Sequence, residues 1–78
     1  MVVTSLNTYP MSGVPNCYLV TGVEGALSVR VNGGVIPASV NRTSEGWLLC
    51  FVPPKSGTYT LEISTSKGQV ALTRTYVF

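Results

Sequence analysis

Histidine and aspartate are absent from this 78-residue chain, and charged residues are scarce. Without those two residue types there is no Ser-His-Asp triad, no Cys-His pair and no aspartyl dyad. The charged fraction is 10%, compared with about 25% in an average soluble domain. The three acids, Glu24, Glu45 and Glu62, occupy an expected turn, loop and outward strand position, so we interpret them as solvated carboxylates rather than a glycosidase pair. We expect no enzymatic activity and no catalytic residues.

Metal ligands and cofactor motifs are also lacking. Two cysteines without histidine fall short of the four ligands of a structural zinc site. One glutamate in a loop supplies too few oxygens for calcium. The glycines are single or paired in expected turns and form no phosphate-binding motif. The sequence therefore predicts no metal and no cofactor.

The charge balance argues against two classes of partner. The net charge is +2, and the five basic residues are scattered along the chain, so no basic patch for nucleic acid or an anionic membrane is expected. No apolar run approaches the ~18 residues of a membrane span. The first ten residues lack the basic and continuous apolar regions of a secretory signal peptide. We expect the chain to stay in the cytosol or to leave it by assembly into a particle.

The chain is organised around residues 46–63, which read GWLLCFVPPKSGTYTLEI. Two runs within it, 47–52 and 59–63, alternate with the period of two that places strand side chains on opposite faces. Between them lies PPKSG, whose prolines donate no ladder hydrogen bond and whose glycine favours a turn. The stretch therefore predicts two neighbouring strands.

The rest of the chain supplies further short strands. Pro37 has no N–H to donate and predicts that the strand around it lies at a sheet edge. Strands are expected at 2–6, 17–21, 27–31, 36–40 and 69–78, with a loop at 41–46. Six or seven antiparallel strands separated by regular turn signals predict one all-β domain, a small sandwich. We expect residues 1–16 to form an edge strand and an irregular connector or arm, and residues 17–78 to form the sandwich core.

The run 47–52 is apolar at every position. If Trp47 and its odd-numbered neighbours face the core, then Leu48, Cys50 and Val52 form a second apolar stripe that should meet solvent. A strand apolar on both faces is either buried on both sides or faces a partner. We therefore predict that Leu48, Cys50 and Val52 form a protein interaction surface, and that the chain is a homo- or hetero-oligomer bound to itself or to a larger scaffold.

Two cysteines permit one disulfide. A disulfide that joins the two sheets is known in immunoglobulin domains, but an outward Cys50 is on the wrong face for it. We expect Cys17 and Cys50 to be two reduced, small apolar side chains.

Three residues admit both a functional and a structural interpretation. Trp47 is in phase with the core stripe, and the alternative is an exposed platform for a sugar. Tyr59 is placed to direct its hydroxyl to nearby backbone as a tyrosine corner. Asn41 opens a formal glycosylation sequon, which we interpret as chance in the absence of a signal peptide.

The pattern resembles an immunoglobulin-like domain of the filamin-repeat kind over residues 17–78. The matching segment places Pro53 four residues before Gly57, and Tyr59 two residues later, between two neighbouring strands. The matching core positions are Leu27, Val29, Val31, Trp47, Leu49, Phe51, Leu61 and Ile63, with Gly33 in the turn that follows Val31. The resemblance implies an immunoglobulin-like sandwich and says little about function.

Filamin repeats are tandem modules, whereas this chain is one module with its own Met1. Single modules of this type look more like small phage proteins, so we expect a structural component of a phage virion, a capsid decoration or tail protein, with a cytoplasmic location as the alternative. The expected partner is a capsid or tail protein. Two other functions stay open: a carbohydrate or cell-surface adhesion module, and a cytosolic scaffold that binds an extended peptide by strand addition.

Overall fold

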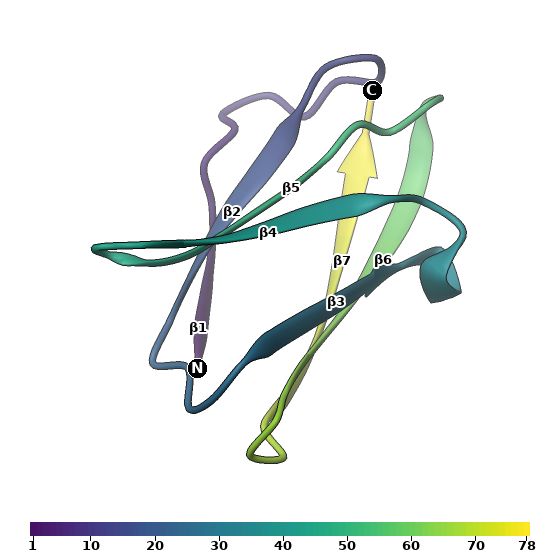
Figure 1. Cartoon of the computed structure of the whole chain (residues 1–78). Helices are drawn as coiled ribbons and strands as arrows, with labels where there is room; N and C mark the ends of the chain where they lie inside the picture. The colour runs from purple at the N-terminus through teal and green to yellow at the C-terminus, as the bar shows by residue number, and fades with distance from the viewer.

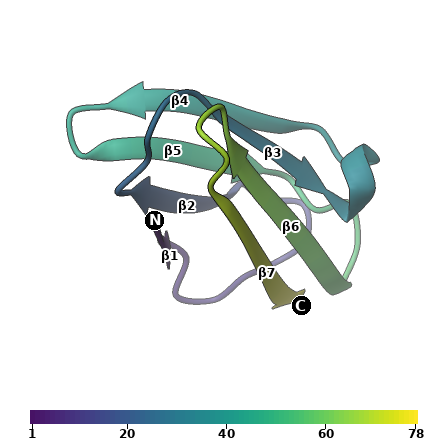
Figure 2. The same ribbon diagram turned by 90° about the horizontal axis from the view of Figure 1, so that it is seen from below.

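The protein is a two-layer antiparallel sandwich in the computed structural model, which describes residues 1–78. One sheet has the strand order β1-β2-β5-β4 and the other β3-β6-β7, and Figures 1 and 2 show them as two layers. Seven strands in two antiparallel sheets confirm the predicted all-β sandwich. The strand order within the sheets is the one found in constant-type immunoglobulin domains. No helix in it is long and apolar enough to span a membrane. The elements are β1 (Val2–Ser5), β2 (Asn16–Thr21), β3 (Leu27–Val31), the 3₁₀ turn η1 (Asn32–Gly34), β4 (Ala38–Thr43), β5 (Gly46–Phe51), β6 (Gly57–Thr65) and β7 (Val70–Val77).

The hydrophobic core lies between the two sheets. Val20 and Leu49 of the four-stranded sheet and Leu61 and Ile63 of the three-stranded sheet have no exposed surface. Removing one such aliphatic side chain from water contributes about 1.5–3 kcal/mol. The complete buried cluster is Tyr18, Val20, Leu27, Val31, Leu49, Phe51, Tyr59, Leu61, Ile63 and Val77.

Strands β5 and β6 have the predicted alternation. Leu49 and Phe51 are buried, and Trp47 is half-buried against the same core. The hydroxyl of Tyr59 donates a hydrogen bond of 2.6 Å to the Lys55 carbonyl oxygen and accepts one of 3.3 Å from the Lys55 N–H. The predicted tyrosine corner is therefore present, and it closes the connection between the two sheets.

The predicted loop at residues 41–46 is wrong. Strand β4 continues to Thr43 and pairs with β5 through Arg42↔Trp47 and Thr43↔Gly46, so only Ser44 and Glu45 make the turn. Polar composition suggested a loop, but β4 is the edge strand predicted from Pro37. Its alternate side chains face solvent, and polar residues are compatible with that position.

Two asparagines fasten the connector between β1 and β2. Asn7 accepts a hydrogen bond of 2.8 Å from the Cys17 N–H and donates one of 3.1 Å to the Pro15 carbonyl. Asn16 is buried and donates to the carbonyls of Met11 and Val14, both at 3.0 Å. These side-chain hydrogen bonds, together with the backbone bond of 2.9 Å from the Leu6 N–H to the Cys17 carbonyl, fix this part of the chain to the start of β2.

Candidate interaction surface

The predicted surface residues lie on the outer face of the four-stranded sheet or at its end. Leu49 and Phe51 point into the core, so Leu48 and Cys50 point outward, where they are half-buried. Val52 follows the end of β5 and is 50% exposed. The geometric part of the prediction is therefore confirmed, while its role in binding stays a prediction.

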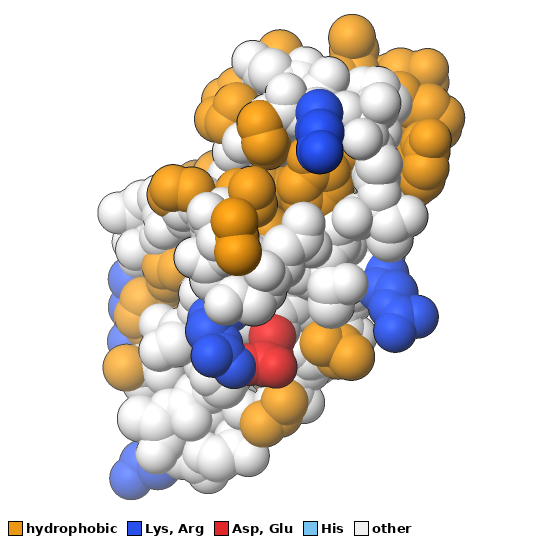
Figure 3. Space-filling view, turned by 90° about the vertical axis from the view of Figure 1, so that its right-hand side faces the viewer, with side chains coloured by type: hydrophobic (Ala, Val, Ile, Leu, Met, Phe, Trp, Pro, Cys, Tyr) orange, Lys and Arg blue, Asp and Glu red, His pale blue; other side chains and the backbone are white.

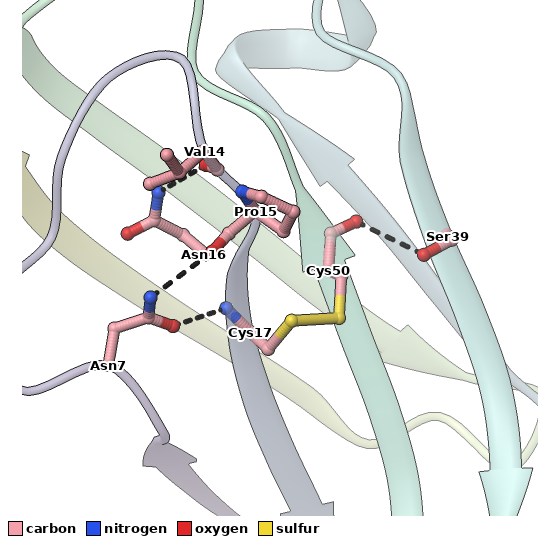
Figure 4. The surroundings of a disulfide bond; sticks show 7 residues. All are labelled: Asn7, Val14, Pro15, Asn16, Cys17, Ser39 and Cys50. Carbon is pink, nitrogen blue, oxygen red and sulfur yellow. Dashed lines mark hydrogen bonds between the residues drawn. A yellow bond between two sulfur atoms is a disulfide. The ribbon is translucent and has the colours of Figure 1, made fainter.

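Cys17 and Cys50 form a disulfide (Figure 4). The expectation of two reduced thiols is therefore wrong. The bond joins neighbouring strands β2 and β5 within one sheet, so the outward orientation inferred for Cys50 is correct and the sheets are not bridged. The error came from considering only a disulfide between sheets.

The backbone explains why these two residues can bond. Cys17 uses its N–H for the Asn7 side chain and its carbonyl for the N–H of Leu6, both on the side of β1. The Cys50 carbonyl accepts a bond of 3.4 Å from the Ser39 hydroxyl, on the side of β4. Neither cysteine bonds toward the other, so they form a non-hydrogen-bonded pair, the closer kind in an antiparallel ladder. Their Cα atoms are 4.2 Å apart.

An apolar strip runs along the centre of this outer face. We call it the disulfide face and define it as Cys17 and Leu19 of β2 with Leu48 and Cys50 of β5. Leu19 lies directly opposite Leu48, in the register that also joins the cysteines. Outward-facing residues on the flanking strands are uncharged and, apart from the exposed Val2 at the start of β1, polar. By the register the polar ones are Thr4 of β1 and Ser39, Asn41 and Thr43 of β4.

An open groove of about 500 Å³ adjoins one end of the disulfide face. It is lined by Pro15, Pro37, Ala38, Ser39, Cys50, Phe51 and Val52. Two of the predicted surface residues, Cys50 and Val52, therefore meet a recess rather than a flat sheet. The groove extends the apolar strip to the start of β4 and the end of β5.

A second apolar surface lies on β7 and was missed by sequence reasoning. Val70, Leu72 and Tyr76 are 71%, 61% and 56% exposed. At the end of the strand Phe78 contacts Tyr76 and stacks on Tyr9 with ring centroids 4.9 Å apart. Figure 3 shows hydrophobic side chains gathered most densely toward the end of the molecule where the C-terminus lies. The signal was present in the alternation of β7, whose even-numbered residues are the larger ones.

The outer face of the three-stranded sheet also carries the single ion pair. Arg30 of β3 lies opposite Glu62 of β6, with the guanidinium Nη2 2.5 Å from the carboxylate Oε1. Both side chains are exposed, at 62% and 45%. Of the two sheets, only this one presents charged residues on its outer face.

Trp47 is not a free platform. Its ring packs against the core, and the Arg42 guanidinium carbon lies 5.6 Å from the ring centroid. A cavity of about 260 Å³ opens beside it and is lined by Arg42, Glu45, Trp47 and neighbouring residues. Because stacking on a sugar needs an open ring face, the position occupied by Arg42 disfavours the carbohydrate interpretation.

Comparisons with family models, curated proteins and solved structures find no match to this chain.

Proposed function

We propose that this protein is a non-catalytic structural subunit that binds a larger protein assembly through the disulfide face. The observation that carries the proposal is the uncharged strip of Leu19, Leu48 and the Cys17–Cys50 disulfide, with Val52 and the groove at its end. In its most specific form, the assembly is a phage particle and the protein decorates a capsid or forms part of a tail.

The chemistry of the strip supports a protein partner. Interface cores are depleted in charged residues and surrounded by a polar rim, and this face has an apolar centre flanked by uncharged residues, which are threonine, serine and asparagine except for Val2. The disulfide within the strip holds β2 and β5 together, so little ordering entropy is lost when a partner binds. A rigid, uncharged face suits repeated docking onto a scaffold.

Footprinting of the native assembly tests this proposal. The chain is isolated from its source in particles and alone, and hydroxyl-radical labelling is compared at Leu19, Leu48 and Val52. We expect these side chains to be protected in the assembly and labelled in the isolated chain. Recovery of the native chain only at its isolated mass, or equal labelling in both states, would contradict the proposal.

A matched pair of variants sharpens the test. Leu48→Lys adds a charge at the centre of the strip, and we expect it to abolish incorporation into particles. Ser28→Lys adds the same charge at an exposed position of β3 on the opposite sheet and should leave incorporation unchanged. Equal loss in both variants would show that the disulfide face has no specific role.

A further inference from the structure

Strand β7 is an open edge of the three-stranded sheet. Its only strand neighbour is β6. It is eight residues long, whereas β1, the edge strand of the other sheet, has four. The remaining edge strands, β3 and β4, lie beside each other, and Val31 of β3 forms a bridge with Ile36, two residues before β4 begins. Long exposed edges are templates for pairing with another strand, and β7 is the strand of this molecule most suited to it.

The hydrogen-bond pattern identifies the residues that point to the open edge. The Thr65 N–H donates to the Gln69 carbonyl at 3.0 Å, so Thr65 and Gln69 form a hydrogen-bonded pair at the start of the β6–β7 ladder. The register is continuous from there to Gly57↔Val77. Because such pairs alternate along a ladder, odd-numbered residues of β7 bond to β6. The residues that direct their N–H and carbonyl groups away from β6 are Val70, Leu72, Arg74 and Tyr76.

The hydrogen bonds at the other end of β7 show the same alternation. Phe78, the next even-numbered residue, donates from its N–H to the Pro10 carbonyl at 3.0 Å and accepts from the Ser12 N–H at 2.9 Å. The connector after β1 therefore occupies the edge at Phe78. The open part ends at Tyr76.

The side chains of β7 are also arranged for a partner. Its inward residues include Ala71, Thr73 and Thr75, whereas Leu72 and Tyr76 project outward and are exposed. Edge strands that stay unpaired are usually short, bulged or charged. The only charged residue on β7 is Arg74.

We propose that β7 pairs with β7 of a second copy of this chain, antiparallel about a two-fold axis through Thr73. The four open residues are symmetric about that position, so one register pairs all of them. Val70 then lies opposite Tyr76 of the second copy, and Leu72 opposite Arg74. The two three-stranded sheets become one continuous six-stranded sheet, as a closed two-fold interface requires.

Neighbouring registers are less favourable. A shift of two residues in one direction places Arg74 opposite Arg74 of the second copy, which is repulsive. A shift of two residues in the other direction places Leu72 opposite Leu72 of the second copy. Tyr76 then lies opposite a residue outside the second copy's β7. In the proposed register Val70 of the second strand lies opposite Tyr76, so the paired segment ends before Phe78, whose edge the connector occupies.

Sedimentation equilibrium over a range of concentrations tests the pairing. We expect the mass to rise from the 8.3 kDa of one chain to twice that value. Leu72→Lys, which places a charge at the edge, should shift dissociation to at least tenfold higher concentration. Ser28→Lys, an equal charge on the opposite edge strand of the same sheet, should not. A mass of one chain at every concentration, or equal effects of the two variants, would overturn the proposal.

A proline variant tests the backbone pairing itself. The Leu72 N–H points away from β6, so Leu72→Pro removes an edge donor without removing a bond of the existing ladder. We expect a folded monomer, with the circular dichroism spectrum of the parent chain. Leu72→Lys keeps the test decisive if the proline variant fails to fold, and a Leu72→Pro variant that is folded and still dimeric would refute edge pairing.

Cysteine cross-linking tests the register. Thr73 on the two-fold axis forms a non-hydrogen-bonded pair with itself, the same geometry that joins Cys17 to Cys50. Thr73→Cys should therefore give a disulfide-linked dimer under mild oxidation. Thr75→Cys, which lies opposite Ala71 of the second copy, should not. The reverse result would disprove the register, and monomers that bind an extended peptide at β7 instead would disprove the second copy as its partner.

The pairing of β7 and the proposed function are tested by different measurements. Dimerisation is measured on the purified chain and depends on Leu72, whereas incorporation into a particle depends on Leu48 on the other sheet. A monomeric chain that enters particles would contradict only the pairing of β7.

Discussion

The two sheets of this sandwich expose apolar residues in different ways. On the four-stranded sheet they form a half-buried central strip, joined by a disulfide and flanked by strands whose outward residues are uncharged and mostly polar. On the three-stranded sheet they lie at the edge, where Leu72 and Tyr76 are more exposed than anything on the disulfide face, and the centre carries an ion pair instead.

This difference separates two kinds of surface. The disulfide face is complete as a sheet, because each of its central strands has a neighbour on both sides, and it can bind a partner only through side chains. The edge of β7 is incomplete as a sheet and offers backbone groups as well. A face of the first kind suits a shaped partner, whereas an edge of the second kind suits another strand.

The largest expected effect tests what the two sheets share. Leu49 of the four-stranded sheet and Leu61 of the three-stranded sheet both point into the shared core, and neither is exposed. We expect Leu49→Ala and Leu61→Ala each to lower the free energy of unfolding by about 2–5 kcal/mol, measured by urea titration at one low protein concentration. The matched change Leu72→Ala, at an exposed position, should cost less than about 0.5 kcal/mol. A much smaller loss at Leu61 than at Leu49 would show that the sheets do not depend equally on the core.

The disulfide should distinguish the sheets. Cys17 and Cys50 are 33 residues apart in sequence, and the chain-entropy model assigns about 3–4 kcal/mol to a loop of that length. We expect the double variant Cys17→Ala/Cys50→Ala to lose that amount, with a loss of hydrogen-exchange protection in β2 and β5 before β6. Reductant should destabilise the parent chain and leave the variant unchanged. Two free thiols in the native protein, detected by mass spectrometry, would remove the basis of this prediction.

Local pattern was sufficient for most of the fold. The alternation of residues 47–52 and the PPKSG turn correctly located β5, its inward face and the start of β6, because these depend on neighbours in sequence. The loop at 41–46 was wrong because its polar residues are equally compatible with an exposed edge strand, and only the pairing of Arg42 with Trp47 distinguishes the two.

The sequence did not reveal which strands lie side by side or in which register they pair. That Cys17 can bond to Cys50 requires knowing that β2 lies beside β5 in a register that makes them opposite. The orientation of β7 could not be predicted either. Burial of apolar surface alone would favour placing its larger residues toward the core. Pairing with β6 places Ala71 opposite Ile63 and turns Leu72 outward.

A smaller effect concerns the link between the sheets. Tyr59 is buried, and its hydroxyl bonds to the backbone of Lys55. We expect Tyr59→Phe to lower the free energy of unfolding by about 1–2 kcal/mol, because the Lys55 carbonyl loses its partner. Tyr76→Phe removes a hydroxyl from an exposed tyrosine and should cost nothing measurable. Equal stability of the two variants would mean that the corner does not hold the sheets in place.

The smallest expected effect is on the outer face of the three-stranded sheet. Arg30 and Glu62 are in contact but well exposed, so screening by solvent limits their attraction, and we expect Glu62→Gln to lower the free energy of unfolding by less than about 1 kcal/mol. Raising the salt to about 1 M should remove the difference, since the Debye length then falls to about 3 Å. The double variant Arg30→Gln/Glu62→Gln controls for the lone arginine left by the single change. A loss above about 2 kcal/mol that persists in salt would show that charge, rather than the edge of β7, is the dominant feature of this sheet.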